Sequence, residues 1–254
     1  MNEISKVNFN KNLTFVFMNF IKNNLANIFT LGNLFSGTIG VINLVEGNYK
    51  ITALCIIISL VLDFCDGFIA RALKSNSNLG AQLDSLADMV SFGVLPGIIM
   101  YKALEPFGNQ LVGITLPFEI KYFGLLITLF SCLRLAIFNL DEDQKYYFKG
   151  LNTPANTILI FGLYYPFREQ RTFNFIFDNV EILLLLSVVS ALLLVSPIKM
   201  IAMRFKSMKW QENISKITLV VGSVLLLISL KIIGIPLVIL YYILVSLLFQ
   251  KSLN

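Results

Sequence analysis

Apolar stretches long enough to cross a lipid bilayer recur along almost the whole chain of 254 residues. Crossing a hydrocarbon core takes about 20 residues of helix, and only helices or closed barrels satisfy their own backbone hydrogen bonds there. Hydrophobic residues make up 56% of the sequence and charged residues only 14%, which is too apolar for a soluble domain. The sequence therefore predicts an all-α, polytopic membrane bundle.

The apolar pattern predicts a single domain over residues 1–254 with about eight transmembrane helices. The expected spans are residues 28–46, 51–72, 80–101, 121–140, 152–167, 180–197, 217–232 and 235–250. Residues 1–24 mix lysines with large apolar residues and lack a signal-peptide cleavage site. We expect them to form an amphipathic helix on the membrane surface, and the alternative is a poorly ordered basic tail.

The net charge of +5 comes mostly from short hydrophilic connections between the apolar segments. Acidic lipid headgroups fit this distribution better than nucleic acid, which we do not expect as a partner. Cytoplasmic loops collect Lys and Arg, so the pattern predicts that both termini face the cytoplasm. The expected location is the cell membrane, with multiple passes. The basic residues on the predicted inner side are Arg71, Lys74, Lys145, Lys149, Lys199, Arg204, Lys206, Lys209, Lys216 and Lys251.

The chain contains no histidine, which removes the commonest metal ligand and proton shuttle. Its three cysteines lie in apolar segments without paired spacing, so neither a disulfide framework nor a zinc site is expected. Any acid–base or metal chemistry must therefore use carboxylates.

Four carboxylates fall inside segments that should be buried in lipid: Asp63, Asp66, Asp84 and Asp88. A carboxylate at membrane depth costs several kcal/mol unless it is paired or ligated. On a helix, Asp63, Asp66, Gly67, Ala70 and Arg71 fall within an arc of roughly 140°. Gly80, Asp84 and Asp88 fall within roughly 80° on the next helix, so two opposed helices would bring the four carboxylates together.

Oxygen ligands without histidine or thiolate suit Mg²⁺ or Mn²⁺, and two such ions would balance four carboxylates. The small residues Gly67 and Ala70 would let a nucleotide approach, and Arg71 could hold phosphate oxygens. Two alternatives use no bound nucleotide. One is a buried ion-pair network that ties two helices together, and the other is a divalent-cation transporter with the aspartates as its transport site.

The spacing D-x2-D-G-x2-A-R-x8-G-x3-D-x3-D resembles the signature of the CDP-alcohol phosphatidyltransferase family, with every specified residue present. The resemblance implies two divalent ions, a CDP-linked lipid as donor and CMP as leaving group. It implies a first ion on Asp63, Asp66 and Asp84, a second on Asp63, Asp84 and Asp88, and Asp88 as general base. It also implies contacts to CDP-diacylglycerol from Asn27, Thr30, Asn33, Gly67, Ala70, Arg71, Ser77 and Gly80.

Within the family, residues 26–157 are most similar to bacterial and archaeal members that use L-serine. The likeness includes the segments Asn27–Asn33, Met89–Pro96, Arg134–Asn139 and Phe148–Ala155. It implies phosphatidylserine as product, and similar proteins are homodimers. Glycerol 3-phosphate or an inositol phosphate is the alternative acceptor.

Arg134 is the expected acceptor anchor, and the alternative is that it snorkels to the membrane interface. The chain departs from the family pattern at Ala26, Ile137 and Asn152, where proline, arginine and proline are usual. The departure at Ile137 bears most on the acceptor contacts.

Overall fold

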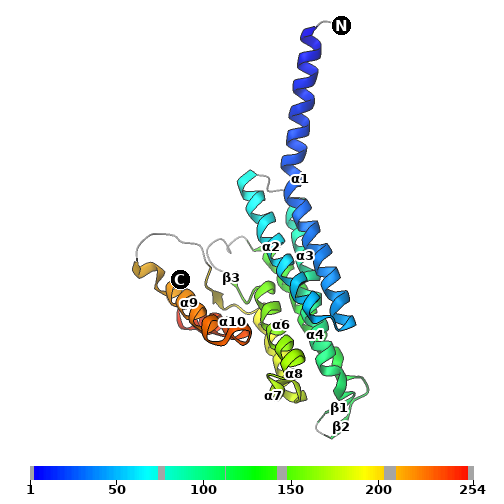
Figure 1. Ribbon diagram of the computed structural model, residues 1–254, viewed down its shortest axis with the longest axis vertical. Helices are drawn as coiled ribbons and strands as arrows, with labels where there is room; N and C mark the ends of the chain where they lie inside the picture. The colour runs from blue at the N-terminus through cyan, green and yellow to red at the C-terminus, as the bar shows by residue number, and fades with distance from the viewer. Residues whose placement is uncertain (1–2, 74–77, 112, 142–147, 203–209, 251–254) are drawn as a thin grey trace.

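The computed structural model describes residues 3–73, 78–111, 113–141, 148–202 and 210–250, and these residues form a helical bundle (Figure 1). Its first half contains α1 (Glu3–Glu46), α2 (Tyr49–Leu73), α3 (Asn78–Asp88), the π-helix η1 (Met89–Val94) and α4 (Leu95–Leu104). The remaining elements are η2 (Glu105–Phe107), β1 (Gln110–Leu111), β2 (Ile114–Thr115), η3 (Ile120–Leu125), α5 (Leu126–Leu140), β3 (Phe148–Lys149), α6 (Thr153–Gln170), α7 (Asn174–Phe177), α8 (Val180–Leu194), β4 (Lys199–Met200), α9 (Trp210–Leu230), η4 (Lys231–Ile233) and α10 (Gly234–Leu248).

Five helical stretches of the described chain are long and apolar enough to cross a membrane. They are Asn24–Glu46, Tyr49–Leu73, Asn78–Phe107, Ile120–Leu140 and Asn213–Leu248. This confirms the polytopic helical bundle. The predicted number of eight is not confirmed, because α6 is not among the five and α8 is a shorter apolar helix. In addition, the single stretch Asn213–Leu248 covers nearly all of the last two predicted spans.

Helix α1 runs without interruption from Glu3 through the first span, and its N-terminal half extends away from the bundle (Figure 1). The helix therefore has no break at the predicted boundary near Asn24. The physical reason is that the first 31 residues contain neither glycine nor proline, so no residue there ends the helix. The proposed location of residues 1–24 on the membrane surface stays a prediction.

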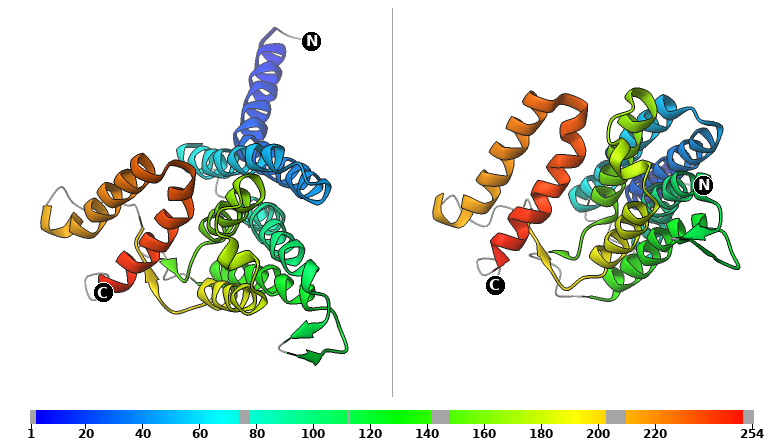
Figure 2. Two further views of the ribbon diagram at one scale, coloured as in Figure 1. Left: turned by 60° about the horizontal axis from the view of Figure 1, so that its bottom comes forward. Right: turned by 90° about the horizontal axis from the view of Figure 1, so that it is seen from below.

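The core lies where α4, α6 and α8 meet. Ile99 and Met100 of α4, Ile160 of α6 and Leu183 of α8 are almost fully buried in one apolar cluster. Helices α1 and α2 pack against each other on one side of it, and the α9–α10 hairpin lies on another side (Figure 2). Gly162 of α6 makes room for Pro236 of α10, because a Cβ at Gly162 would lie 3.0 Å from the proline ring.

The long stretch from α3 to α4 is α-helical except at η1, immediately after Asp88. Pro96 has no N–H to donate to the carbonyl of Phe92, and that carbonyl accepts a hydrogen bond from Thr157 Oγ1 at 3.0 Å. The carbonyl of Gly93 likewise accepts from Thr128 Oγ1 at 3.1 Å. Side chains of α5 and α6 thus satisfy backbone groups that the π-helical turn leaves open.

A short antiparallel pairing joins β3 to β4, with Lys149 opposite Lys199. Gly150 follows with φ +74°, and a Cβ there would lie 2.5 Å from the carbonyl oxygen of Leu194. Glycine is therefore required both by the backbone conformation and by the close approach of the end of α8. The pairing brings the segment before α6 against the segment after α8.

Candidate active site

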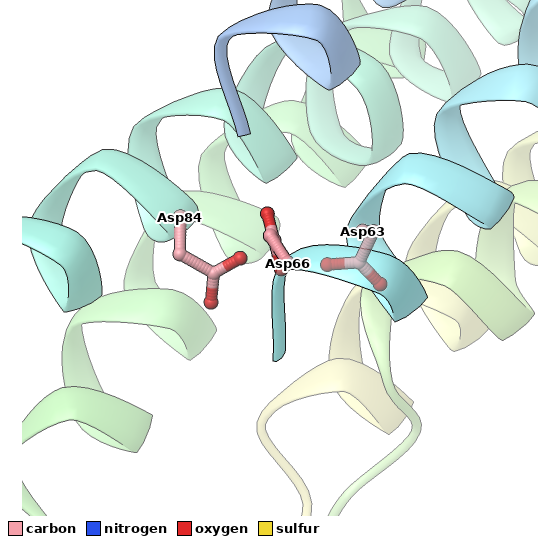
Figure 3. Close-up of side chains that lie close together, drawn as sticks. All are labelled: Asp63, Asp66 and Asp84. Carbon is pink, nitrogen blue, oxygen red and sulfur yellow. The ribbon is translucent and has the colours of Figure 1, made fainter. Parts of the chain in front are cut away.

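Three aspartates from two helices converge at one end of the bundle. Asp63 and Asp66 lie on α2 and Asp84 lies on α3, and one ligand oxygen from each falls within 4.8 Å of the others (Figure 3). Helix α1 packs against both α2 and α3 and so fixes their relative position. The helical spacing in the sequence predicted this meeting of side chains.

Asp88 lies one turn beyond Asp84, at the end of α3. It is buried, with 9% of its surface exposed, and it lies outside the group of three. Asp63 is close enough to both Asp84 and Asp88 for side-chain hydrogen bonding. Asp63 therefore belongs to the group of three and also lies near Asp88, which is the position that a shared ligand of two ions would need.

Residues of α1 hold two of these carboxylates. Thr30 Oγ1 donates a hydrogen bond of 2.6 Å to Oδ2 of Asp66, and Asn33 Nδ2 donates one of 3.1 Å to Oδ1 of Asp88. Thr30 and Asn33 are buried, and Asn27 is half-buried one turn before Thr30. The resemblance implies contacts to CDP-diacylglycerol for all three residues, and in the structure Thr30 and Asn33 hydrogen-bond to aspartates.

The predicted nucleotide-binding residues of α2 lie beside the carboxylates. The Arg71 guanidinium folds over Gly67, where a Cβ would lie 3.3 Å from Nη1, and its charge acts on Asp66. Ala70 is half-buried on the same helix, and Gly80 is half-buried near the start of α3. Ser77 lies outside the described residues.

The residues present fit a divalent metal ion. Three carboxylate oxygens lie together, and within the described chain Oδ1 of Asp84 is buried without a hydrogen-bond partner. A buried acceptor without a donor is costly, and a hard cation would satisfy it. With only oxygen ligands, the set suits Mg²⁺ or Mn²⁺ better than zinc or copper.

A cavity of about 240 Å³ is lined by Arg134, Asp141, Lys149 and Ser196 among others. Arg134 has 7% of its surface exposed, and its Nε donates a hydrogen bond of 2.9 Å to the carbonyl of Leu151. It is therefore fixed inside the protein and does not snorkel. Its charge acts on Asp88, which connects the cavity with the carboxylate centre.

Two cavity residues follow from tertiary structure that the sequence pattern did not predict. Lys149 Nζ forms an ion pair of 2.6 Å with Oδ2 of Asp141, and Ser196 reaches the cavity from the end of α8. The sequence signal for Ser196 is the segment Val195–Lys199, which also resembles the family. Ile137, at a family arginine position, lines the same cavity. Asn152, at a family proline position, caps α6 by accepting a hydrogen bond from the N–H of Ala155.

A membrane-spanning helical bundle with a carboxylate centre and a cavity lined by Arg134, Lys149 and Asp141 is the arrangement of a polytopic membrane enzyme. Comparison with known families matches residues 23–193 to the CDP-alcohol phosphatidyltransferases, and the chain belongs to this family.

Several curated proteins are similar to it. A CDP-diacylglycerol–serine O-phosphatidyltransferase of Helicobacter pylori is 29% identical over 198 residues, covering 76% of this chain and 78% of that protein. The Bacillus subtilis enzyme of the same name is 34% identical over 125 residues, covering 49% of this chain and 66% of that protein. An archaetidylserine synthase of Methanothermobacter thermautotrophicus is 28% identical over 169 residues, covering 65% and 68%.

Proposed function

We propose that this protein transfers the phosphatidyl group of CDP-diacylglycerol to the hydroxyl of L-serine, which gives phosphatidylserine and CMP. The observation that carries the proposal is the complete family signature folded into a carboxylate centre beside the Arg134 cavity. The relatives named for serine transfer support the choice of acceptor.

The cavity supports an acceptor that carries both charges. Arg134 offers a cation to a carboxylate, and the ion pair of Lys149 and Asp141 presents both charges in the same lining. An acceptor with a phosphate would favour a lining without a carboxylate. The lining therefore fits the zwitterion serine better than glycerol 3-phosphate or an inositol phosphate.

In the proposed reaction, Asp63, Asp66, Asp84 and Asp88 would hold two divalent ions, Mg²⁺ or Mn²⁺. Bound there, these ions would polarise the diphosphate and stabilise the charge that develops on CMP. Arg71 would contact the phosphate oxygens beside Gly67, and Arg134 would orient the serine carboxylate. Asp88 would accept the proton of the serine hydroxyl as this oxygen attacks the phosphorus that bears the diacylglycerol.

The spans indicate a multi-pass membrane protein. We further propose that it resides in the cell membrane as a homodimer, with the carboxylate centre facing the cytoplasm. The excess of Lys and Arg in the connections at that end supports this orientation.

CMP release by the purified full-length protein from CDP-diacylglycerol tests the proposal. L-serine, glycerol 3-phosphate and inositol phosphate are compared as acceptors with and without a divalent ion. We expect release to require the ion and to be fastest with serine. Faster release with glycerol 3-phosphate would contradict the serine assignment and leave the family intact, whereas no release with any acceptor would contradict phosphatidyl transfer itself.

A further inference from the structure

A second cavity, of about 360 Å³, lies at the end of the bundle opposite the aspartates. The C-terminal ends of α4 and α6 form its walls together with α7. Helix α2 begins at this end with Tyr49 and reaches Asp63 about four turns later, roughly 20 Å along its axis. This end of the bundle is therefore separated from the carboxylate centre by most of the thickness of a bilayer's hydrocarbon core.

Cations dominate the charge around this cavity. Lys102, Arg168 and Arg171 line it, and Asp178 is the one carboxylate in its lining. Lys102 Nζ donates a hydrogen bond of 2.9 Å to the carbonyl of Val45, which fixes its charge at the rim. We call the cavity, with its aromatic residues Tyr164, Phe167 and Phe177, the aromatic–basic pocket.

Both arginines are held by aromatic rings. Arg168 lies over Tyr49 and Tyr164 at 5.2 and 5.9 Å from their ring centres, and Arg171 lies over Phe167 at 5.6 Å. In the part of the chain that the structure describes, no carboxylate lies within ion-pair distance of either guanidinium. A guanidinium stacked by its face keeps its N–H edges directed sideways, where they can bind an anion in a bidentate manner.

The loop that carries Arg171 has an unusual backbone. Arg171 and Phe173 have φ values of 56° and 64°, in the left-handed region that residues other than glycine seldom adopt. Each such residue costs about 1 kcal/mol or more, and strain of this kind persists where the surrounding structure requires it. Here the left-handed backbone ends α6 at Arg171 and starts α7 after Phe173. Phe177 of α7 then stacks on Phe167, with 4.5 Å between the ring centres.

We propose that the aromatic–basic pocket binds the phosphate group of an anionic phospholipid headgroup, at the membrane surface opposite the carboxylate centre. The pocket lies at the end of the candidate span Asn78–Phe107, which is the depth of the headgroups. Arg168 and Arg171 supply guanidinium groups, which bind phosphate through paired N–H donors, and the aromatic residues of the pocket suit the boundary between headgroup and acyl chain. Free inorganic phosphate could bind the same arginines, but it has no apolar part to contact the aromatic residues of the pocket.

Phosphatidylglycerol binding to the purified full-length protein in detergent tests this proposal. Native mass spectrometry gives its affinity, and thermal unfolding gives its stabilising effect, with phosphatidylcholine and inorganic phosphate as comparison ligands. We expect phosphatidylglycerol to bind more tightly than phosphatidylcholine. The double variant Arg168→Gln/Arg171→Gln should weaken phosphatidylglycerol binding about tenfold or more, because two charge-assisted contacts are lost.

Three further variants make the result specific. Lys50→Gln removes an exposed cation at the same end but outside the pocket, and it should leave the affinity unchanged. Asp84→Asn alters the carboxylate centre and should also leave it unchanged. Asp178→Asn removes the carboxylate of the lining and should tighten binding, a gain that misfolding would not produce. Equal binding by the double variant and the unmodified protein would overturn the proposal, as would equal stabilisation by inorganic phosphate.

Discussion

The side-chain amide of Asn33 on α1 donates a hydrogen bond of 3.1 Å to Oδ1 of Asp88, at the end of α3. The main-chain carbonyl of Asn33 accepts two more, from Ser59 Oγ at 3.3 Å and from Ser91 Oγ at 3.1 Å. Gly37 permits this close packing, since a Cβ there would lie 2.1 Å from Ser91 Oγ. Asn33 thus joins α1, α2 and η1 at one buried point and sets the position of the Asp88 carboxylate.

Replacing Asn33 by leucine should therefore act through Asp88. Asn33→Leu keeps a similar volume and removes the donor, so we expect kcat to fall at least about tenfold with little change in the KM for CDP-diacylglycerol. Ser59→Ala is the matched control, because it removes a hydrogen bond to the same residue without touching a carboxylate. A raised KM for CDP-diacylglycerol at unchanged kcat would instead indicate direct contact between Asn33 and the lipid donor.

The sequence predicted the carboxylate centre because helical periodicity alone places Asp63 and Asp66 on one face and Asp84 on a face of the next helix. It could not predict the partners of these residues. Thr30 and Asp66 are 36 positions apart, and Asn33 and Asp88 are 55 apart. Such contacts depend on how α1 packs against α2 and α3, which a pattern along one helix does not contain.

Two other features lay beyond the sequence pattern for different reasons. The sequence of the π-helix η1 has the pattern of an ordinary apolar helix. Its π-helical form depends on Thr128 and Thr157, which lie on other helices and hydrogen-bond to the carbonyls left open near Pro96. The pairing of Lys149 with Lys199 involves only two residues in each strand, too few for an alternating pattern to appear. The sequence therefore indicated Arg134 and Ile137 of the acceptor cavity but not the β3–β4 pairing that closes it.

Asp63 and Asp84 should support metal binding and turnover together. Asp63→Asn or Asp84→Asn removes a negative ligand from the group of three, so we expect loss of CMP release and weaker Mn²⁺ binding by titration calorimetry. Asp178→Asn, at the other end of the bundle, should change neither. Retention of more than a few per cent of activity in either of the first two variants would argue strongly against a two-ion site.

Chelation should separate the role of the metal from that of the fold. Because Oδ1 of Asp84 is buried without a partner in the described chain, removal of a bound ion should expose strong repulsion among the carboxylates. We expect a chelator to abolish turnover and to lower the thermal unfolding temperature, and Mg²⁺ or Mn²⁺ to restore both. Asp84→Asn should show a smaller thermal response to the chelator, because it has less charge to repel.

Arg134 should affect the acceptor more than the donor. Its guanidinium is buried in the cavity with Asp141 and Lys149, so Arg134→Ala should raise the KM for serine about tenfold or more and change that for CDP-diacylglycerol less. Arg134→Lys keeps the charge but not the planar hydrogen bond to Leu151, and it should recover only part of the loss. An equal rise in both KM values would count against an acceptor site here.

Gly150 should be needed for both stability and acceptor binding. Gly150→Ala places a Cβ 2.5 Å from the carbonyl oxygen of Leu194 at φ +74°, so we expect a loss of about 1–3 kcal/mol of stability and a raised KM for serine. Gly113→Ala is the matched control, since its φ is +78° and no atom lies within 4 Å of the added Cβ. Equal thermal shifts in the two variants would show that the contact with Leu194 contributes nothing.

The last prediction separates the two proposed roles of Asp88. The chain has no histidine, so a carboxylate is the nearest available base for a serine hydroxyl. Asp88 is a buried carboxylate that interacts electrostatically with Arg134, the proposed acceptor anchor. Asp88→Asn keeps the size of the side chain and an oxygen that can accept the Asn33 amide, but it removes the basic group. We therefore expect CDP-diacylglycerol binding to stay nearly intact while kcat falls about 10²-fold or more at saturating metal.

Measuring donor affinity and turnover side by side in this variant distinguishes the outcomes. Loss of donor affinity together with Mn²⁺ affinity would identify metal binding as the main task of Asp88. Near-normal turnover would rule out the base assignment, because an amide cannot take the proton of the serine hydroxyl. Asn33→Leu then provides the comparison, since it leaves the basic group in place and removes only its hydrogen bond. A smaller fall in kcat for Asn33→Leu than for Asp88→Asn is what a positioned base requires.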